Sequence, residues 1–204
     1  MTANSIELRF ASFDEVEINK AEALRYMGYK AKVPPDEIEG LFSLCMNLLR
    51  DAVSYKACFT SVPLKLLGDG KIDLGFGVVQ SYNLEKNLAG CGEAYLFAAT
   101  AGIAVDRLIM RYSRTEPSKS VVIDAIASAA VEGWCNKINA EMKQNSNTKP
   151  RYSPGYGDLT LKHQKDILEY LDAQRKIGIT LSQSLLMSPT KSVTAIVGIR
   201  EEKA

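Results

Sequence analysis

The segment from Val121 to Met142 constrains the fold of this chain more than any other part of the sequence. Alanine and serine dominate its early turns, and larger apolar side chains follow at Ile126, Val131, Trp134 and Ile138. Small side chains let a neighbouring helix or sheet approach closely, and the apolar spacing is that of a helix. The pattern therefore predicts one long, buried central helix.

Further helices and strands are indicated on both sides of this segment. Apolar stripes predict helices over residues 34–52, 104–112 and 161–176, and Gly178 is placed to end the last of them. Apolar runs rich in β-branched or aromatic residues predict strands over residues 93–100 and 192–199.

Residues 59–67 and 71–79 flank the turn sequence Gly68-Asp69-Gly70 and predict a β-hairpin. The second run alternates apolar and polar residues, which would put Gly75-Phe76-Gly77 inside a strand. Helices and strands interleave without a strict βαβ rhythm. We therefore expect an α+β fold, with a mostly antiparallel sheet flanked by helices. A single domain is expected over residues 1–204, with a helix-plus-hairpin portion (1–90) and a portion that carries a candidate ligand loop (91–204).

Composition excludes several classes of protein. Hydrophobic residues make up 46% and charged residues 24%, which is typical of a globular domain with a sizeable core. Lys plus Arg number 25 against 24 for Asp plus Glu, so the charge balance does not favour a nucleic-acid or membrane-surface partner.

The four cysteines are widely spaced and His163 is the one histidine, which argues against a zinc site. Without a signal-like start or a long apolar run, we expect a cytoplasmic protein with reduced thiols.

Residues 144–157 interrupt the helical pattern with asparagines, prolines and glycines. A break of this length inside a compact domain is usually functional or disordered. Arg151 can hold a carboxylate through two hydrogen bonds, Pro154 and Gly155 shape an exposed backbone, and Tyr156 offers a flat ring. The same residues are equally compatible with an ordinary surface turn.

Four basic residues are grouped around the helix predicted over 104–112. Arg107, Arg111 and Arg114 follow one edge of it, and Lys119 comes shortly after. They are compatible with a solvated helix face or with a docking surface for an acidic partner.

Two ordered blocks resemble signatures of a known family. The first is Arg151-x-x-Pro154-Gly155-Tyr156, and the second is LSQSLLMSP over residues 181–189, with Ser192-Val193 just beyond. Upstream, the run LFAATAG (96–102) and the helix through Asp124 and Glu132 resemble the segment that precedes the first block. Residues 24–29 resemble the entry segment of free-standing members. The chain is thus similar to the activation, or reactivation, domain of cobalamin-dependent methionine synthase, in its free-standing bacterial form.

The resemblance implies a ligand and a site. Members of that family bind S-adenosylmethionine and support the remethylation of cobalamin in methionine biosynthesis. By resemblance, Arg151 would hold the ligand carboxylate. Ser153, Gly155 and Tyr156, on a loop shaped by Pro154, would line the adenosyl or corrin side.

The resemblance also implies partners. The cobalamin would come from a separate methionine synthase or a related corrinoid protein, and the electron from a donor such as a flavodoxin. The chain itself lacks the D-x-H-x-x-G motif of a cobalamin carrier, because Leu161 stands two residues before His163. The methyl group of a sulfonium is already electrophilic, so positioning suffices and no catalytic acid or base is expected.

The leading interpretation is therefore an S-adenosylmethionine-dependent methyltransferase component that reactivates cobalamin on a separate methionine synthase. Ser128 departs from the family pattern, because activation domains that are fused to methionine synthase have an acidic residue at this position. This departure motivates the next interpretation. An alternative is a non-catalytic S-adenosylmethionine-binding sensor or docking module for another corrinoid protein. A third possibility is an interaction protein that kept the fold without the ligand.

Overall fold

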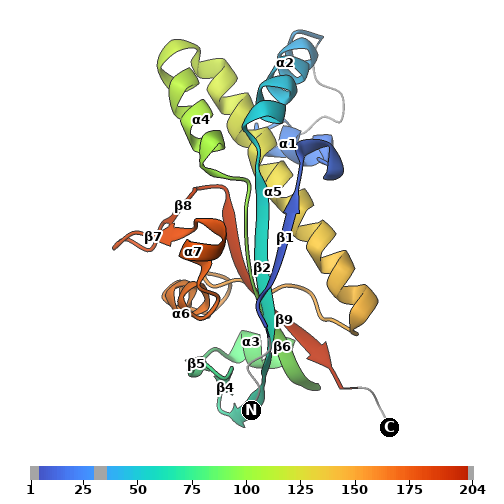
Figure 1. Cartoon of the computed structure of the whole chain (residues 1–204), viewed down its shortest axis with the longest axis vertical. Helices are drawn as coiled ribbons and strands as arrows, with labels where there is room; N and C mark the ends of the chain where they lie inside the picture. The colour runs from blue at the N-terminus through green and yellow to red at the C-terminus, as the bar shows by residue number, and fades with distance from the viewer. Residues whose placement is uncertain (1–4, 30–35, 202–204) are drawn as a thin grey trace.

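The computed structural model describes residues 5–29 and 36–201 and is built around a four-stranded sheet (Figure 1). Its strands, in spatial order, are β1 (Glu7–Ala11), β2 (Tyr55–Pro63), β6 (Cys91–Thr100) and β9 (Ser192–Arg200). Each neighbouring pair is antiparallel. The predicted α+β class is confirmed, and strands from both portions of the chain form one sheet.

Alternate residues of the central strands lie in two separate apolar cores. In β6, Phe97 and Ala99 belong to the core beside the long helix, whereas Leu96 and Ala98 belong to the core on the opposite face. A strand that is covered on both faces has a nearly continuous apolar sequence. The runs over 93–100 and 192–199 have this character, and both predicted strands are confirmed.

One face of the sheet is covered by four helices: α1 (Lys20–Tyr26), α2 (Asp36–Ala52), α4 (Ile103–Thr115) and α5 (Pro117–Asn145). The predicted central helix is confirmed as α5, which extends beyond the predicted range at both ends. The Trp134 Nε1–H donates to the carbonyl oxygen of Lys56 in β2 (3.1 Å), and the Trp134 and Tyr55 ring centroids lie 5.6 Å apart. These contacts fix α5 across the sheet. Pro34 and Pro35, at the predicted start of α2, lie outside the described residues.

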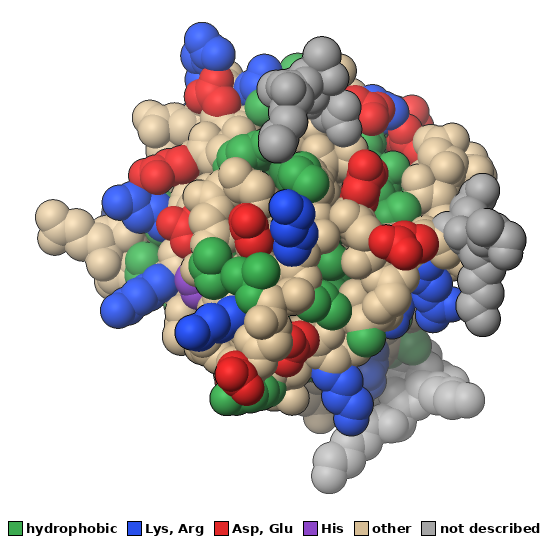
Figure 2. All heavy atoms as spheres, turned by 90° about the horizontal axis from the view of Figure 1, so that it is seen from below, with side chains coloured by type: hydrophobic (Ala, Val, Ile, Leu, Met, Phe, Trp, Pro, Cys, Tyr) green, Lys and Arg blue, Asp and Glu red, His purple; other side chains and the backbone are tan. Residues whose placement is uncertain are grey.

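The opposite face carries smaller elements. They are α3 (Tyr82–Asn87), α6 (His163–Tyr170), α7 (Ala173–Ile177), a three-stranded sheet of β3 (Lys65–Gly68), β4 (Lys71–Asp73) and β5 (Val78–Gln80), and the pair β7 (Thr180–Leu181) and β8 (Met187–Ser188). A short 3-10 helix, η1 (Phe13–Glu15), follows β1. Figure 2 shows the end of the molecule at β3–β5, where basic and acidic side chains are interspersed.

The hairpin prediction was correct at its turn and wrong in its strands. The turn at Gly68-Asp69-Gly70 joins β3 to β4, but the segment predicted as strand 71–79 reverses direction between β4 and β5. Gly75 and Gly77 both have positive φ, and the Asp73 carboxylate accepts the Gly75 N–H (3.0 Å). A local side-chain bond of this kind competes with the strand ladder, so the two glycines lie in a turn.

The prediction of a single helix over residues 161–176 was also wrong. It is two helices, α6 and α7, separated at Asp172, which has a left-handed φ of 49°. Aspartate tolerates this conformation better than most residues, and its carboxylate pairs with Arg175 (2.6 Å). The apolar residues continue through the break, which is why their spacing hides it. Gly178 ends α7 in a left-handed conformation, as predicted.

Gly133 is required where α5 crosses the segment that precedes α1. A Cβ atom at this position would lie 2.2 Å from the carbonyl oxygen of Glu17. We expect Gly133→Ala to lower the free energy of unfolding by about 1 to 3 kcal/mol, because the backbone of one segment must move. Urea titration measures this.

A matched control is Gly40→Ala in the exposed part of α2, where an added Cβ meets no atom within 4 Å. It should be neutral or stabilising by up to about 1 kcal/mol through helix propensity. Equal stability of the two variants would contradict the proposed close approach at Gly133.

Candidate functional site

The segment after α5 runs along the outer edge of β9. The N–H of Lys149 donates to Gly198 O (2.8 Å), and Tyr152 and Ile196 exchange two backbone hydrogen bonds of 2.9 Å. The predicted break thus begins at Ser146 and behaves in part as an extra strand. Neighbouring side chains of such a segment point to opposite faces.

Arg151 points to the face that α5 covers. Its Nη2 donates to Glu132 Oε2 (2.9 Å) and to Asn136 Oδ1 (3.1 Å), two residues one helical turn apart on α5. Its Nη1 is buried and has no hydrogen-bond partner among the described residues, although the side chain as a whole is 17% exposed. Arg151 is therefore held from one side of its guanidinium and has an unused donor on the other.

The predicted site residues Ser153, Pro154, Gly155 and Tyr156 form a closed turn. The Gly155 N–H donates to Leu159 O (2.8 Å), the Tyr156 N–H donates to Ser153 O (3.1 Å), and Gly155 has φ +92°. Pro154 is buried, whereas the Tyr156 side chain is 71% exposed. Within the described part of the chain, no hydrogen bond or ion pair joins Arg151 to this turn.

Asp158 anchors the end of the loop, a role that the sequence did not reveal. Its carboxylate accepts hydrogen bonds from the Ser81 hydroxyl and from the N–H groups of Tyr82 (2.7 Å) and Asn83 (3.2 Å) at the start of α3. The Ser81 hydroxyl, followed by these backbone donors, lowers the pKa of Asp158 below its ordinary value of 3.8.

The lowered pKa predicts an acid-dependent loosening of the loop. Asp158 contributes stability fully above its unfolded pKa, and this contribution is lost as the pH falls through the lower, folded pKa. We expect Asp158→Asn to flatten the fall in stability below about pH 4. Urea titrations of both proteins between about pH 6 and pH 3 measure this. An identical acid-side slope in parent and variant would remove Asp158 from this role.

Lys191 binds the same side of α5 as Arg151. Its Nζ lies 2.8 Å from Asp124 Oδ1 and donates to Ser128 Oγ (3.0 Å). Together with the Arg151 contacts, these make a polar stripe that repeats every four residues along α5: Asp124, Ser128, Glu132 and Asn136. The sequence singled out Ser128 and Glu132 but could not identify the cations that meet them.

A cavity of about 560 Å³ adjoins Arg151, Glu132 and Asn136, which we call the Arg151 cluster. It is lined by Glu17, Asn19, Glu22, Gly133, Asn136 and Lys137. Asn136, which accepts a hydrogen bond from Arg151, belongs to its wall, so the cavity and the arginine share one side chain. The segment before α1 also lines this cavity, through Glu17 and Asn19. Asn136 therefore connects that segment to Arg151 of the predicted loop.

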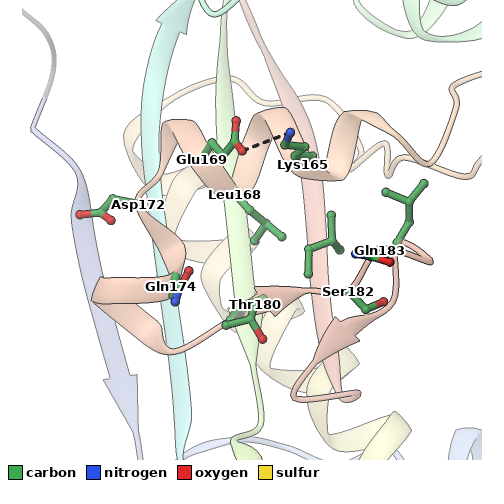
Figure 3. A pocket seen from close by; sticks show the side chains of 11 residues that line it. Lys165, Leu168, Glu169, Asp172, Gln174, Thr180, Ser182 and Gln183 are labelled. Carbon is green, nitrogen blue, oxygen red and sulfur yellow. Dashed lines mark ion pairs between the residues drawn. The ribbon is translucent and has the colours of Figure 1, made fainter.

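A second cavity, of about 640 Å³, lies on the other side of the sheet between α6, α7 and the β7–β8 hairpin (Figure 3). Leu168 points into it from α6, and its opposite side is lined by Thr180 and, from the second sequence block, by Ser182 and Gln183. The Gln164 side chain donates to Leu185 O (3.0 Å) and thereby fixes the hairpin on α6. None of the predicted site residues lines either cavity, and only the first cavity includes a residue, Asn136, that bonds to Arg151.

The thiols and the histidine are not arranged for acid–base or nucleophilic chemistry. All four cysteines are buried, and burial raises the pKa of the thiol to about 11 in Cys45 and to about 12 in Cys58 and Cys135. His163 contacts Asp166 (2.9 Å) on its own helix. Within residues 5–29 and 36–201, no three His, Cys, Asp or Glu side chains are grouped to hold a metal.

Over the same described ranges, no helix combines the length and the apolar character needed to cross a membrane.

Comparison with known proteins identifies the relatives of this chain. The sequence profile of the family described as "Vitamin B12 dependent methionine synthase, activation domain" matches residues 88–204, more than half of the chain. A solved structure titled "Crystal Structure of the MetH Reactivation Domain bound to AdoHcy" has a TM-score of 0.75 and 15% sequence identity, and the match covers 100% of this chain and 81% of that one. No curated protein sequence gives a significant match. At this identity the structural likeness establishes the fold.

Proposed function

Because the chain belongs to the family of activation domains of vitamin B12 dependent methionine synthase, we propose that it binds S-adenosylmethionine and supports remethylation of cobalamin on a separate methionine synthase. The family implies a partner that carries cobalamin. The electron that reduces the cobalamin comes from a donor protein such as a flavodoxin. The activity assigned to this chain is that of one component in a methyltransferase system.

The observation that carries this proposal is that only one of the two terminal guanidinium nitrogens of Arg151 has hydrogen-bond partners among the described residues. Glu132 and Asn136 hold Nη2, while the buried Nη1 has no partner among the described residues. A buried donor without a partner costs free energy, and a carboxylate is the usual partner of an arginine fork. The Arg151 cluster therefore fits the carboxylate of an amino-acid ligand. The similar solved structure has AdoHcy bound, which supports this class of ligand.

The remaining groups of S-adenosylmethionine match the other parts of the site. The ligand also has an ammonium and a sulfonium group, and the adjoining cavity is lined by one basic residue, Lys137, and by two acidic residues, Glu17 and Glu22. Opposite charges of this kind favour a cation over a neutral ligand. The exposed Tyr156 ring offers a face to the adenine or to the corrin, and the backbone of Ser153 and Gly155 forms the turn that presents it.

The chain acts by positioning. The partner's reduced cobalamin supplies the nucleophile that takes the methyl group, the C–S bond breaks, and the sulfur keeps its electron pair as S-adenosylhomocysteine. This transfer needs no proton to be moved, so a site without an acid–base pair is sufficient. Holding the sulfonium in the reactive position lowers the activation free energy of the transfer by several kcal/mol.

Two assays separate this function from its alternatives. Calorimetric titration with S-adenosylmethionine should give one site per chain, and a chemically reduced cobalamin-carrying partner should then be remethylated. Binding without remethylation would favour the non-catalytic sensor or docking module. Absence of binding would favour an interaction protein that kept only the fold.

A further inference from the structure

The outward face of α4 carries an unusual row of side chains. Ile103, Arg107, Met110 and Arg114 are three or four residues apart, and all four are exposed. Ile103 is 43% exposed and Met110 is 60% exposed. Arg111 lies beside the row, with its guanidinium 5.6 Å from the centre of the Tyr112 ring. We call these five residues the α4 face.

The α4 face carries positive charge that no ion pair among the described residues neutralises. The one carboxylate within α4, Asp106, accepts hydrogen bonds from the N–H and hydroxyl of Thr190 (2.8 and 2.7 Å). Glu116, just after α4, pairs with Lys119 (2.6 Å). No ion pair within residues 5–29 and 36–201 involves Arg107, Arg111 or Arg114. The chain as a whole has a net charge of +1, and the opposite end has mixed charges (Figure 2). The positive α4 face is therefore a local feature.

The α4 face flanks the proposed ligand site. Asp106 of α4 binds Thr190, the neighbouring Lys191 binds Asp124 of α5, and Glu132 of α5 binds Arg151. Asp124 and Glu132 are eight residues apart on α5, which is about 12 Å along a helix. A protein that covers the Arg151 cluster can therefore reach α4.

We propose that the α4 face docks an acidic surface of the cobalamin-carrying partner and speeds their encounter. The inference rests on the proposed function, since that function requires such a partner. The exposed Met110 between arginines, with the exposed Ile103 at the end of the row, resembles the centre of a protein interface, in which Met and Arg are enriched. A nucleic-acid-binding domain usually has a strongly basic balance, whereas this chain has a net charge of +1. Attraction by exposed charges raises the association rate more than the affinity, which suits a partner that must leave again.

The test compares two variants with the same net charge. The first is Arg107→Gln with Arg111→Gln and Arg114→Gln. The control is Lys65→Gln with Lys71→Gln and Lys143→Gln, three exposed lysines elsewhere. Each removes three positive charges from a net charge of +1. The association rate with the cobalamin-carrying module of a methionine synthase is measured by stopped flow at about 20 mM and about 0.5 M salt.

We expect the arginine variant to associate about tenfold more slowly than the parent at low salt and at a similar rate at high salt. The lysine control should stay within about twofold of the parent. An arginine variant that matches the parent at low salt overturns the proposal, and so does a loss that is equal at both salt concentrations. A parent that does not associate with the module also overturns it. S-adenosylmethionine titration of all three proteins tests the proposed function separately, and should give equal affinities.

Discussion

Replacing Arg151 with alanine is expected to weaken S-adenosylmethionine binding by about 10- to 150-fold, or about 1.5 to 3 kcal/mol. The variant would lose the proposed charge-assisted bond to the ligand carboxylate, and it leaves Glu132 and Asn136 without the guanidinium that joins them. Both effects act on the ligand site, and Arg151 is at the edge of the sheet, so the fold should survive. Titration calorimetry measures the affinity, and circular dichroism checks the fold.

Two controls make the Arg151 result specific. Arg151→Lys keeps the positive charge but loses the planar fork, so it should bind more weakly than the parent and better than the alanine variant. Arg175→Ala removes an exposed arginine that pairs with Asp172 beside the other cavity, and it should bind S-adenosylmethionine as the parent does. A folded Arg151→Ala variant with unchanged affinity would show that the carboxylate is bound elsewhere.

Replacing Trp134 with alanine is expected to lower the free energy of unfolding by about 3 to 5 kcal/mol. The side chain is 1% exposed, packs on Tyr55, and donates its only N–H to the carbonyl oxygen of Lys56. Its removal leaves a cavity between α5 and the sheet. Because Glu132 and Asn136 lie on the same stretch of α5, ligand binding should weaken as well.

Trp134→Phe is the matched variant, because it keeps most of the ring volume and loses the hydrogen bond. It should cost less than the alanine variant, with about 1 kcal/mol from the lost bond itself. Urea titration gives both values. A Trp134→Ala variant destabilised by less than about 1 kcal/mol would mean that α5 is not fixed to the sheet at this position.

The sequence predicted best those elements that are buried along most of their length. The helix α5 and the strands β6 and β9 have apolar patterns set by contact with the core, and the pattern survives in the sequence alone. The edge strand β1 was missed, because it has only five residues, none of them fully buried, and lacks the continuous apolar run of the central strands. The break at Asp172 was missed, because one backbone angle decides it.

For the candidate site, residue types left a ligand loop and an ordinary turn equally open, the family resemblance favoured Arg151 and its loop, and the partners of that loop could not be predicted. Glu132 and Asn136 meet Arg151 only because β9 carries the loop across α5. Asp158 binds the start of α3, which is 75 or more residues away in the sequence. The cavity beside Asn136 needs Gly133 and Glu17 to come together. Such contacts between distant segments arise from packing, which periodicity does not encode.

By the proposed function, this chain supports methyl transfer from S-adenosylmethionine to cobalamin on a partner. The most direct test follows labelled methyl groups from S-adenosylmethionine into the cobalamin of a methionine synthase module. Titanium(III) citrate serves as reductant, so that the result does not depend on the natural electron donor. We predict that adding the chain raises the transfer rate, and that the Arg151→Ala variant raises it much less at limiting S-adenosylmethionine. Equal rates with and without the parent chain would contradict the account.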